Sequence, residues 1–378
     1  MLRSISTIFL VLLLGLQYEH LSGQDSRPAT LEGVIINAEN QEPLPGAHIF
    51  LAGTTIGTHS DSEGRYRLEE VPAGAHRVAI SMVGFGLTAK DTLVTAGKTH
   101  KFNFSIHPVT IEMSEVQVEL DDDWYDDLDR FYDLFIGTSS LSDSVEIINP
   151  EVLSFESRWW GRFTAEASEP LVIENRSLGY RITYYLDEFR HSGLVTRWDG
   201  EPLFEELRPK DESQQQFWEK NRKKAFYGSV RHFLLTLIHD RVREEGFVIY
   251  EQRRDIRGIS SQNEYRARAS RLISQNDEEG LYDFNFSGRL KVIYTKEGED
   301  HRYVQWARDV IGGPAHSQTS YLELNERPIT IDTDGEILQT YGATRYGHFS
   351  FRRIADRTPR EYRPEVYYER GELLGTAQ

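Results

Sequence analysis

The N-terminal part of the chain consists of short runs of alternating apolar and polar residues, separated by residues that favour turns. Residues 65–68 and 76–81 alternate cleanly, so each run fits a strand with one buried face. Between such runs, Asp61 can accept backbone N–H bonds, and Gly64 can adopt the positive φ of a tight turn. Many short strands at this spacing, without a helical period, predict a small antiparallel β-sandwich over residues 24–120.

The same segment resembles a known family through four motifs that follow one another along the chain. They are Pro-Leu-Pro-Gly-Ala at 43–47, Thr-His-Ser-Asp-Ser-Glu-Gly-Arg-Tyr at 58–66, Val-Pro-Ala-Gly at 71–74 and Ser-Met-Val-Gly-Phe at 81–85. In combination they are similar to the carboxypeptidase regulatory-like domain, a module that accompanies zinc carboxypeptidases. The resemblance implies a transthyretin-like sandwich fold for this segment.

The sequence does not contain the motif that the peptidase itself would need. A zinc carboxypeptidase uses a His-x-x-Glu pair and a distant third His, which leave one metal position open for water. None of the 12 histidines has Glu three residues later, and His-Glu-x-x-His, Gly-x-Ser-x-Gly and the phosphate-binding loop motif are also absent. We therefore expect no catalytic, cofactor-binding or metal-binding residue and no cofactor.

The first 23 residues have the pattern of a secretory signal peptide. Arg3 precedes an apolar run at 9–16, and Leu-Ser-Gly at 21–23 ends in small residues. An uncleaved anchor is the alternative, and no later stretch is apolar for long enough to cross a bilayer as a helix. The chain has no cysteine, which excludes a lipid-modified N-terminal cysteine. We expect an exported protein that is periplasmic or associated with the outer membrane and is not a lipoprotein.

The rest of the chain changes character after the sandwich. Residues 121–140 predict an acidic joint and a short helix, whose first-turn carboxylates complement the helix dipole. Residues 141–370 mix strand patterns with one long helical stretch at 214–245, which Gly228 either kinks or splits. The expected fold is therefore a multidomain, β-rich chain in which an α+β domain follows the sandwich and residues 371–378 form a tail.

This second part is also similar to a family. Among its motifs are Phe-Ile-Gly-Thr-Ser at 135–139, Pro-Leu-Val-Ile-Glu-Asn at 170–175 and Asn-Arg-Lys-Lys-Ala-Phe-Tyr-Gly-Ser at 221–229. Together they resemble exported Bacteroidota-type proteins that carry a carboxypeptidase-like regulatory domain and an uncharacterised C-terminal domain. The resemblance brings no established reaction, so no catalytic residue can be carried over.

Several polar residues within these stretches form a candidate cluster. They are Glu174, Asn175, Tyr180, Glu205, Glu206, Arg231 and His232. Carboxylates with an arginine and a histidine can bind a sugar or carry out acid–base chemistry. An ion-pair network that holds a helix to a sheet would use the same residue types.

Three functions remain open from the sequence. The first is a non-catalytic envelope protein in which the modules bind a partner protein or a glycan ligand. The second is a hydrolase that acts on glycans or peptides through the carboxylates of the C-terminal domain. The third is an accessory component of a TonB-dependent uptake system of the outer membrane. The net charge of −17 opposes binding to nucleic acid, and the oligomeric state is open.

Overall fold

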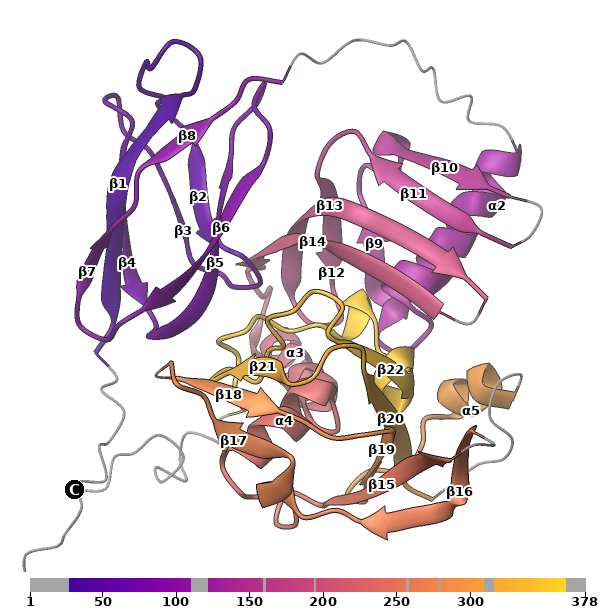
Figure 1. Cartoon of the computed structure of the whole chain (residues 1–378). Coiled ribbons are helices and arrows are strands. Elements are labelled where there is room, and N and C mark those ends of the chain that lie inside the picture. The colour runs from indigo at the N-terminus through magenta and orange to yellow at the C-terminus, as the bar shows by residue number, and fades with distance from the viewer. Residues whose placement is uncertain are drawn as a thin grey trace, which may run out of the picture.

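The computed structural model of the chain describes residues 27–109, 122–158, 161–193, 195–255, 258–278, 280–308 and 316–364. The predicted signal peptide, the boundary at residue 120 and the tail lie outside these residues. Figure 1 shows the N-terminal sandwich beside a six-stranded sheet, with a third, mixed region below both. No helix among the described residues is both long and apolar enough to cross a membrane.

The N-terminal region is a β-sandwich, as its alternating pattern predicted. One sheet contains β1 (Ala29–Asn37), β4 (Arg65–Val71), β7 (Thr99–Lys101) and β8 (Phe104–Ile106), and the other contains β2 (His48–Leu51), β3 (Gly57–His59), β5 (Gly74–Ser81) and β6 (Thr88–Val94). The inward side chains of both sheets form one core that includes Leu31, Ile49, Leu68 and Ile80. In the turn before β4, Asp61 Oδ1 accepts the N–H groups of Glu63 and Arg65, and Gly64 has a φ of 71°, as expected.

The pairing in the sandwich is antiparallel except along one side of β1. There β7 and β8 both run parallel to β1, one after the other. Residues 101–106 alternate in the sequence like one strand, but the structure has two strands there, separated by Phe102 and Asn103. Asn103 Oδ1 accepts the N–H of Val34 at 3.0 Å, so a side chain fills the gap in the ladder.

The region expected to be one α+β domain contains two large sheets that belong to different cores, and a small third sheet. The first sheet comprises β9 (Val145–Ile147), β10 (Leu153–Ser157), β11 (Phe163–Ala167), β12 (Leu171–Asn175), β13 (Tyr180–Ser192) and β14 (Val195–Glu206). The predicted short helix is α2 (Asp122–Phe131), continued by a π-helical segment, Tyr132–Ile136. Its buried Phe131 and Phe135 pack into the core of this sheet, so this helix belongs to the region that follows the sandwich.

The second sheet, of five strands, lies lower in Figure 1 and is accompanied by a small three-stranded sheet. The five strands are β15 (Phe247–Asp255), β16 (Gly258–Arg266), β19 (Arg289–Tyr294), β20 (Gln318–Leu324) and β22 (Ala343–Gly347), and the three are β17 (Ile273–Gln275), β18 (Leu281–Phe284) and β21 (Ile329–Asp332). The helices are α3 (Glu212–Phe226), α4 (Val230–Ile238), α5 (His301–Arg308) and α6 (His348–Phe351). Phe233, Leu234 and Leu237 of α4 pack against the sheets in one core.

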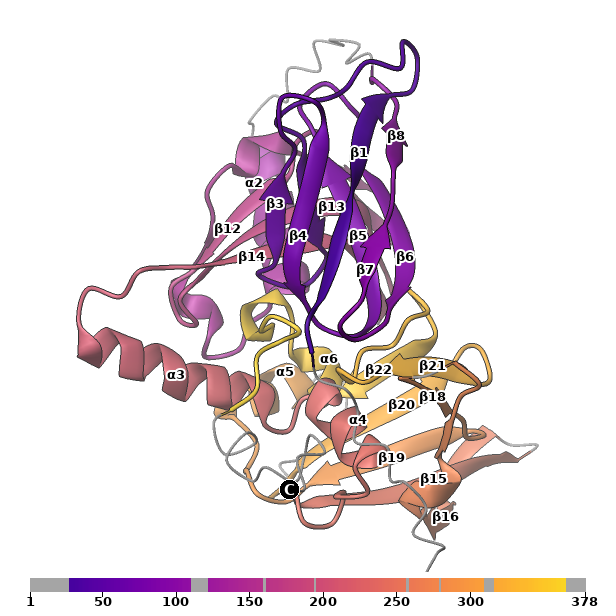
Figure 2. The same cartoon turned by 90° about the vertical axis from the view of Figure 1, so that its left-hand side faces the viewer.

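The long helical stretch predicted at 214–245 is split, which was one of the two expected outcomes. Gly228 has a φ of 69°, and Ser229 then caps α4 by accepting the N–H of His232 on its Oγ. The stretch also ends earlier than expected, because α4 stops at Ile238 and turns lead from there to β15. The split turns α4 against the second sheet, while α3 extends to the side (Figure 2).

The sandwich contacts the rest of the molecule through the turn at 52–55. The Gly53 N–H donates to the carbonyl of Pro202 at 2.6 Å, and the Phe204 N–H donates to the carbonyl of Thr54 at 2.9 Å. Beside these bonds, buried Phe50 and Leu203 belong to an apolar cluster that spans the boundary. The sandwich is therefore packed against β14 by backbone hydrogen bonds and by apolar burial, not only joined to it by the chain.

Candidate functional site

Five of the seven predicted polar residues lie in two neighbouring cross-strand rows of the six-stranded sheet. Glu174 stands opposite Arg181, which stands opposite Glu205, on β12, β13 and β14. In the next row, Asn175 stands opposite Tyr180, which stands opposite Glu206. Because successive residues of a strand point to opposite faces, the two rows do not converge on one site.

Glu174 and Asn175 interact with groups that hold the fold together. Glu174 pairs with Arg176 and Arg181 at 2.8 Å each, and the hydrogen bond from Arg181 lowers the pKa of Glu174. On the other face, buried Asn175 donates to the carbonyl of Ala355 and accepts the N–H of Leu178. These interactions are those of an ion-pair and hydrogen-bond network.

Tyr180 and Glu206 share one partner from α3. The guanidinium of Arg222 lies 4.1 Å from the centre of the Tyr180 ring and donates to Glu206 at 3.1 Å. It also donates to the carbonyl of Leu178 at 2.8 Å, so Arg222 fastens α3 to the sheet. Glu205, the remaining member, is exposed at the end of β14.

Arg231 and His232 come from α4 and point in different directions. Arg231 is buried and donates to the backbone carbonyls of Asp334, Pro359, Arg360 and Tyr362. His232 packs between aromatic rings in the core of the second sheet, where burial lowers its pKa. Of the seven predicted residues, only Arg231 lines the large cavity described next.

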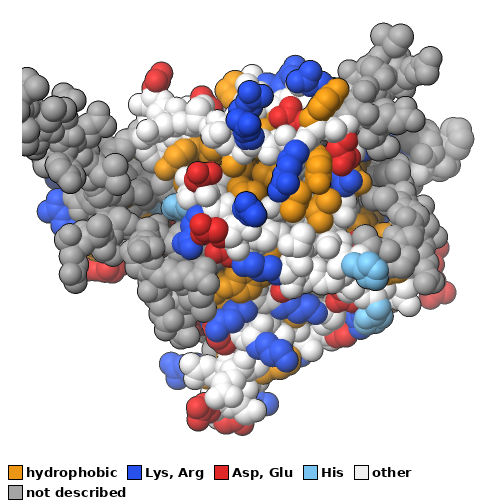
Figure 3. Space-filling view, turned by 90° about the horizontal axis from the view of Figure 1, so that it is seen from below, with side chains coloured by type: hydrophobic (Ala, Val, Ile, Leu, Met, Phe, Trp, Pro, Cys, Tyr) orange, Lys and Arg blue, Asp and Glu red, His pale blue; other side chains and the backbone are white. Residues whose placement is uncertain are grey.

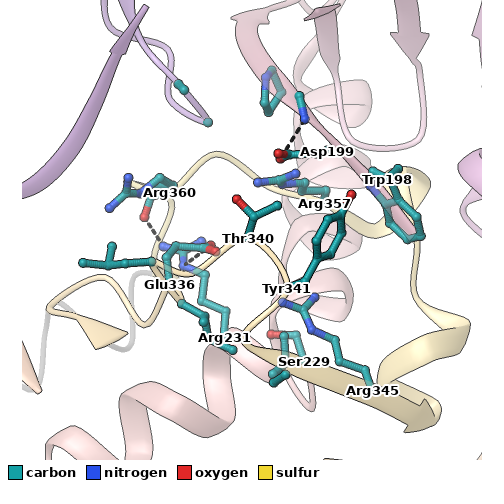
Figure 4. Close-up of a pocket in the computed structure, with 18 of the residues that line it drawn as sticks. Trp198, Asp199, Ser229, Arg231, Glu336, Thr340, Tyr341, Arg345, Arg357 and Arg360 are labelled. Carbon is teal, nitrogen blue, oxygen red and sulfur yellow. Dashed lines mark hydrogen bonds and ion pairs between the residues drawn. The ribbon is translucent and has the colours of Figure 1, made fainter. Parts of the chain in front are cut away.

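A cavity of about 710 Å³ lies where the sandwich, the six-stranded sheet and the C-terminal region meet. The sandwich contributes β5 and the 52–53 turn to its wall, and the six-stranded sheet contributes β14. The rest of the wall is formed by the start of α4, the 336–345 segment that includes the start of β22, and the chain from 349 to 360. Figure 4 shows part of this wall, with Tyr341, Thr340 and Arg345 on one side and Trp198 and Asp199 above them. No single region of the chain encloses the cavity alone.

The sandwich contributes a fixed part of this wall. Arg77 of β5 pairs with Glu201 of β14 and with Asp91 of β6 at 3.1 Å. Near it, Arg360 donates from its backbone to the carbonyl of Gly53 at 2.8 Å and from its side chain to the carbonyl of Ala75 at 3.0 Å. The sandwich is thus tied to both other walls of the cavity.

Eight arginines line the cavity: Arg77, Arg197, Arg231, Arg345, Arg352, Arg353, Arg357 and Arg360. Most of them are engaged by the protein. Arg360 pairs with buried Asp332, Arg352 donates to the carbonyl of Ala225 at 2.7 Å, and Arg353 donates to the carbonyl of Leu134 at 2.8 Å. These groups hold the C-terminal segment against the two sheets.

Arg197, Arg345 and Arg357 differ from the others. Their side chains have no hydrogen-bond or ion-pair partner within the part of the chain that the structure describes, although the Arg197 guanidinium lies 5.5 Å from the centre of the Tyr341 ring. Arg345 is exposed where β22 lines the cavity. Figure 4 shows the Arg345 side chain extending from β22 toward Tyr341.

Charged side chains on the outer surface have different surroundings. On the face seen from below, Lys and Arg side chains are interspersed with Asp, Glu and hydrophobic side chains (Figure 3). Surface arginines of this kind are solvated, so they need no fixed partner. Arg345 is also exposed, so the same reasoning applies to it.

Sequence reasoning did not find this cavity or its arginines. Arg345 stands opposite Leu322, a fully buried core residue, but this pairing is visible only in the structure. Arg345, the sandwich turn and β14 are distant in sequence. Only the docking of the sandwich brings them to one cavity.

Comparison with known proteins supports the assignment of the sandwich. Residues 31–118 match the family model of the CarboxypepD_reg-like domain, so this segment is a carboxypeptidase regulatory-like domain, as its motifs predicted. No curated protein matches the chain. The similarity of the second part to an exported Bacteroidota-type family stays a prediction.

Solved structures share only limited similarity with the chain. A type II cohesin–X-dockerin complex from Acetivibrio cellulolyticus is 20% identical, with a TM-score of 0.17, and the match covers 20% of this chain and 52% of that one. Catechol 1,2-dioxygenase from Acinetobacter sp. ADP1 is 11% identical, with a TM-score of 0.20 and coverage of 24% and 56%. The minor pilin GBS52 from Streptococcus agalactiae is 14% identical, with a TM-score of 0.20 and coverage of 23% and 46%. The chain therefore spans about half the length of these proteins.

Proposed function

We propose that this protein is a non-catalytic, exported protein of the cell envelope that binds a ligand in the cavity beside its regulatory-like sandwich. One observation carries the proposal: three regions of the chain jointly enclose about 710 Å³, and the sandwich supplies part of the wall. Cavities of roughly 300–1,000 Å³ are typical of small-molecule sites. The export of the protein rests on the predicted signal peptide.

The state of the polar groups in the wall supports binding over acid–base catalysis. Glu201 is paired with Arg77, and Glu336 lies 4.0 Å from Arg231. Ser229 uses its Oγ to cap α4 by accepting the His232 N–H. A hydrolase would need carboxylates or a nucleophile that are free to reach the substrate, and these groups are engaged by the fold.

A variant in which a larger side chain fills the cavity tests this proposal. Thr340 faces the cavity and makes no hydrogen bond with the described residues, so Thr340→Trp adds bulk to the cavity without breaking a contact. Among small sugars, peptides and organic acids, we expect compounds that raise the melting temperature of the native protein. The same compounds should leave the melting temperature of this variant unchanged. Thr99→Trp on the exposed side of β7 is the matched control and should keep the response.

Two results would contradict the proposal. If no compound of a broad library stabilises the native protein, the cavity is not a ligand site. If the compounds that bind stabilise Thr340→Trp as strongly as the native protein, they bind elsewhere. Turnover of a glycan or peptide by the native protein, lost in Thr340→Trp, would favour the hydrolase alternative.

A further inference from the structure

We propose that the ligand is an extended peptide segment that adds a strand to the free edge of β14 inside the cavity. This inference rests on the proposed function, since it names the chemical class of the ligand in the same cavity. It depends on three observations: the unused backbone groups of this edge, their place along the cavity wall, and the sandwich turn that already occupies the rest of the edge.

β14 is an edge strand along its whole length. It pairs with β13 from Val195 to Glu206, and it pairs with no other strand among the described residues. In an antiparallel pair, alternate residues of an edge strand direct their N–H and carbonyl groups away from the neighbouring strand. Such groups can form hydrogen bonds with a further strand.

The contacts of the sandwich identify which residues of β14 point outward. The carbonyl of Pro202 and the N–H of Phe204 both bond to the sandwich turn, so the even-numbered residues of β14 face away from β13. The one irregularity in the ladder skips a residue of β13, Asp187, and none of β14. The alternation therefore continues to Trp198 and Thr196, whose outward backbone groups have no hydrogen-bond partner among the described residues.

Gly200 lies between the occupied and the free half of this edge. Its N–H donates to Asp199 Oδ1 at 2.9 Å and not to β13, as expected for an outward-facing residue. A side chain thus fills one position of the edge. Beyond it, toward Val195, no side chain or strand of the described residues takes the outward groups.

The free half of the edge lies in the wall of the cavity. Every residue from 195 to 202 lines it. Burial changes along the strand, because residues 201–204 are buried beside the sandwich, whereas residues 195–200 are only partly buried. The turn of the sandwich and the cavity therefore share one continuous edge, and the cavity runs along the half that the sandwich leaves uncovered.

The opposite wall favours a peptide over the edge of another folded protein. Thr340 and Tyr341 lie below Asp199 in Figure 4, and Tyr341 Oη donates to Glu188 Oε2 of β13 at 2.5 Å. A segment fastened in this way protects the edge from the sheets of neighbouring proteins. A single extended segment needs only the cavity itself, because neighbouring strands lie about 4.8 Å apart.

The chemistry of the free edge also favours a peptide over a sugar. The edge offers N–H donors and carbonyl acceptors that repeat every second residue, and an extended peptide presents the complementary groups with the same repeat. Main-chain hydrogen bonds of this kind provide affinity without a charged anchor, and side chains that alternate to the two sides provide specificity. We therefore expect peptides to bind better than sugars of similar size.

Methylation of the peptide backbone tests the pairing on the native protein. The first probes are capped pentapeptides from a combinatorial library, selected because they raise the melting temperature of the protein. Each peptide that binds is then made in two isomers, with N-methyl groups on its odd-numbered or on its even-numbered residues. Since only alternate residues of an added strand can bond to β14, titration calorimetry should show one isomer at least tenfold weaker and the other about as tight as the parent.

A matched pair of variants at Thr196 tests the edge itself. Thr196→Pro and Thr196→Val both remove the hydroxyl that lies 3.0 Å from His191 Nδ1, but only the first removes the outward N–H. Proline is tolerated on an edge strand where the N–H does not belong to the ladder, so the two variants should melt at similar temperatures. We expect Thr196→Pro to bind the peptides about fivefold more weakly than Thr196→Val. If Thr196→Pro is much less stable, the two methylated isomers decide the question, because they leave the protein unchanged.

The outcomes separate this inference from the proposed function. If sugars or organic acids bind in the cavity, Thr340→Trp blocks them and no peptide binds, the protein is a ligand-binding protein but the peptide assignment is wrong. If peptides bind and both methylated isomers bind alike, the peptide does not pair with β14 and the inference also fails. If nothing binds in the cavity at all, both proposals fail.

Discussion

Arg231 and Arg345 line the same cavity, but their surroundings differ. Arg231 donates to four backbone carbonyls of the C-terminal region, among them those of Asp334 and Pro359. Arg345 has no such partner among the described residues. A buried and hydrogen-bonded arginine such as Arg231 stabilises the fold, whereas Arg345 is exposed and can be solvated without a fixed partner. Residue type alone does not distinguish them.

Buried His76 should make the stability of the protein depend on pH. Burial, followed by the charge of Arg360, lowers its pKa to about 4, while Asp334 acts in the opposite direction. In the unfolded chain the pKa of this group is near its ordinary value of 6.5, so between pH 6.5 and 4 the unfolded state binds more protons. The stabilising effect of neutral His76 is thus complete above pH 6.5, and it is lost as the pH falls toward 4, at about 1.4 kcal/mol per pH unit.

Urea denaturation at several pH values between 7 and 4.5 measures this effect. The comparison is with His76→Gln, whose amide can still donate to the Pro72 carbonyl that His76 Nε2 approaches at 2.7 Å. Other groups titrate in both proteins, so the difference between the two curves isolates His76. The native protein should lose stability more steeply on acidification, and parallel curves would show that His76 is protonated equally in both states.

At the scale of elements, the alternating pattern predicted strands well where one face is buried and the other exposed. β4 shows this: Tyr66 and Leu68 are buried, whereas the alternate residues Arg65, Arg67 and Glu69 are exposed. β14 was missed because its first half is only partly buried on both faces, and it is held by its long pairing with β13. Among the candidate polar residues on the sheet, Glu174 pairs with Arg176 and Arg181, and Glu206 pairs with Arg222. The cavity was beyond prediction, because its walls come from segments that meet only in the tertiary structure.

The break between α3 and α4 depends on Gly228. Besides its positive φ, a Cβ atom at this position would lie 2.5 Å from Gln318 Oε1 and 2.8 Å from Tyr294 Cδ1. Gly228→Ala should therefore lower the free energy of unfolding by about 3 kcal/mol, through backbone strain and overpacking together. Chemical denaturation measures the loss.

Gly46→Ala separates the effect of backbone strain from that of overpacking. Gly46 has a similar φ of 78°, but a Cβ atom there would meet nothing within 4 Å. This variant should lose only the backbone contribution, roughly 1 kcal/mol. Equal losses at the two glycines would mean that the contacts with Gln318 and Tyr294 adjust freely and that steric crowding does not fix the break.

At the scale of the whole molecule, the sandwich is integrated with the regions that follow it. Thr55 donates through its N–H and its hydroxyl to Glu361 at 2.7 and 2.6 Å, although the two residues are far apart in sequence. Phe50 is fully buried outside the sandwich core and stacks on Tyr185 with ring centres 5.4 Å apart. Backbone hydrogen bonds, side-chain bonds and apolar burial at one boundary should couple the unfolding of the parts.

Phe50→Asp should uncouple the unfolding of the sandwich from that of the regions that follow it. The substitution removes the ring from the boundary cluster and places a charge where the native side chain has no access to solvent, while the sandwich core on the opposite face of β2 keeps Ile49 and Leu51. Calorimetry should show one cooperative transition for the native protein and two for the variant, with the sandwich melting separately. Val83→Asp, at a side chain that is 97% exposed, adds the same charge to the sandwich and should leave one transition. Two transitions in the native protein, or one unchanged transition in Phe50→Asp, would show that the sandwich is not held by this boundary, and the cavity would then lose a fixed wall.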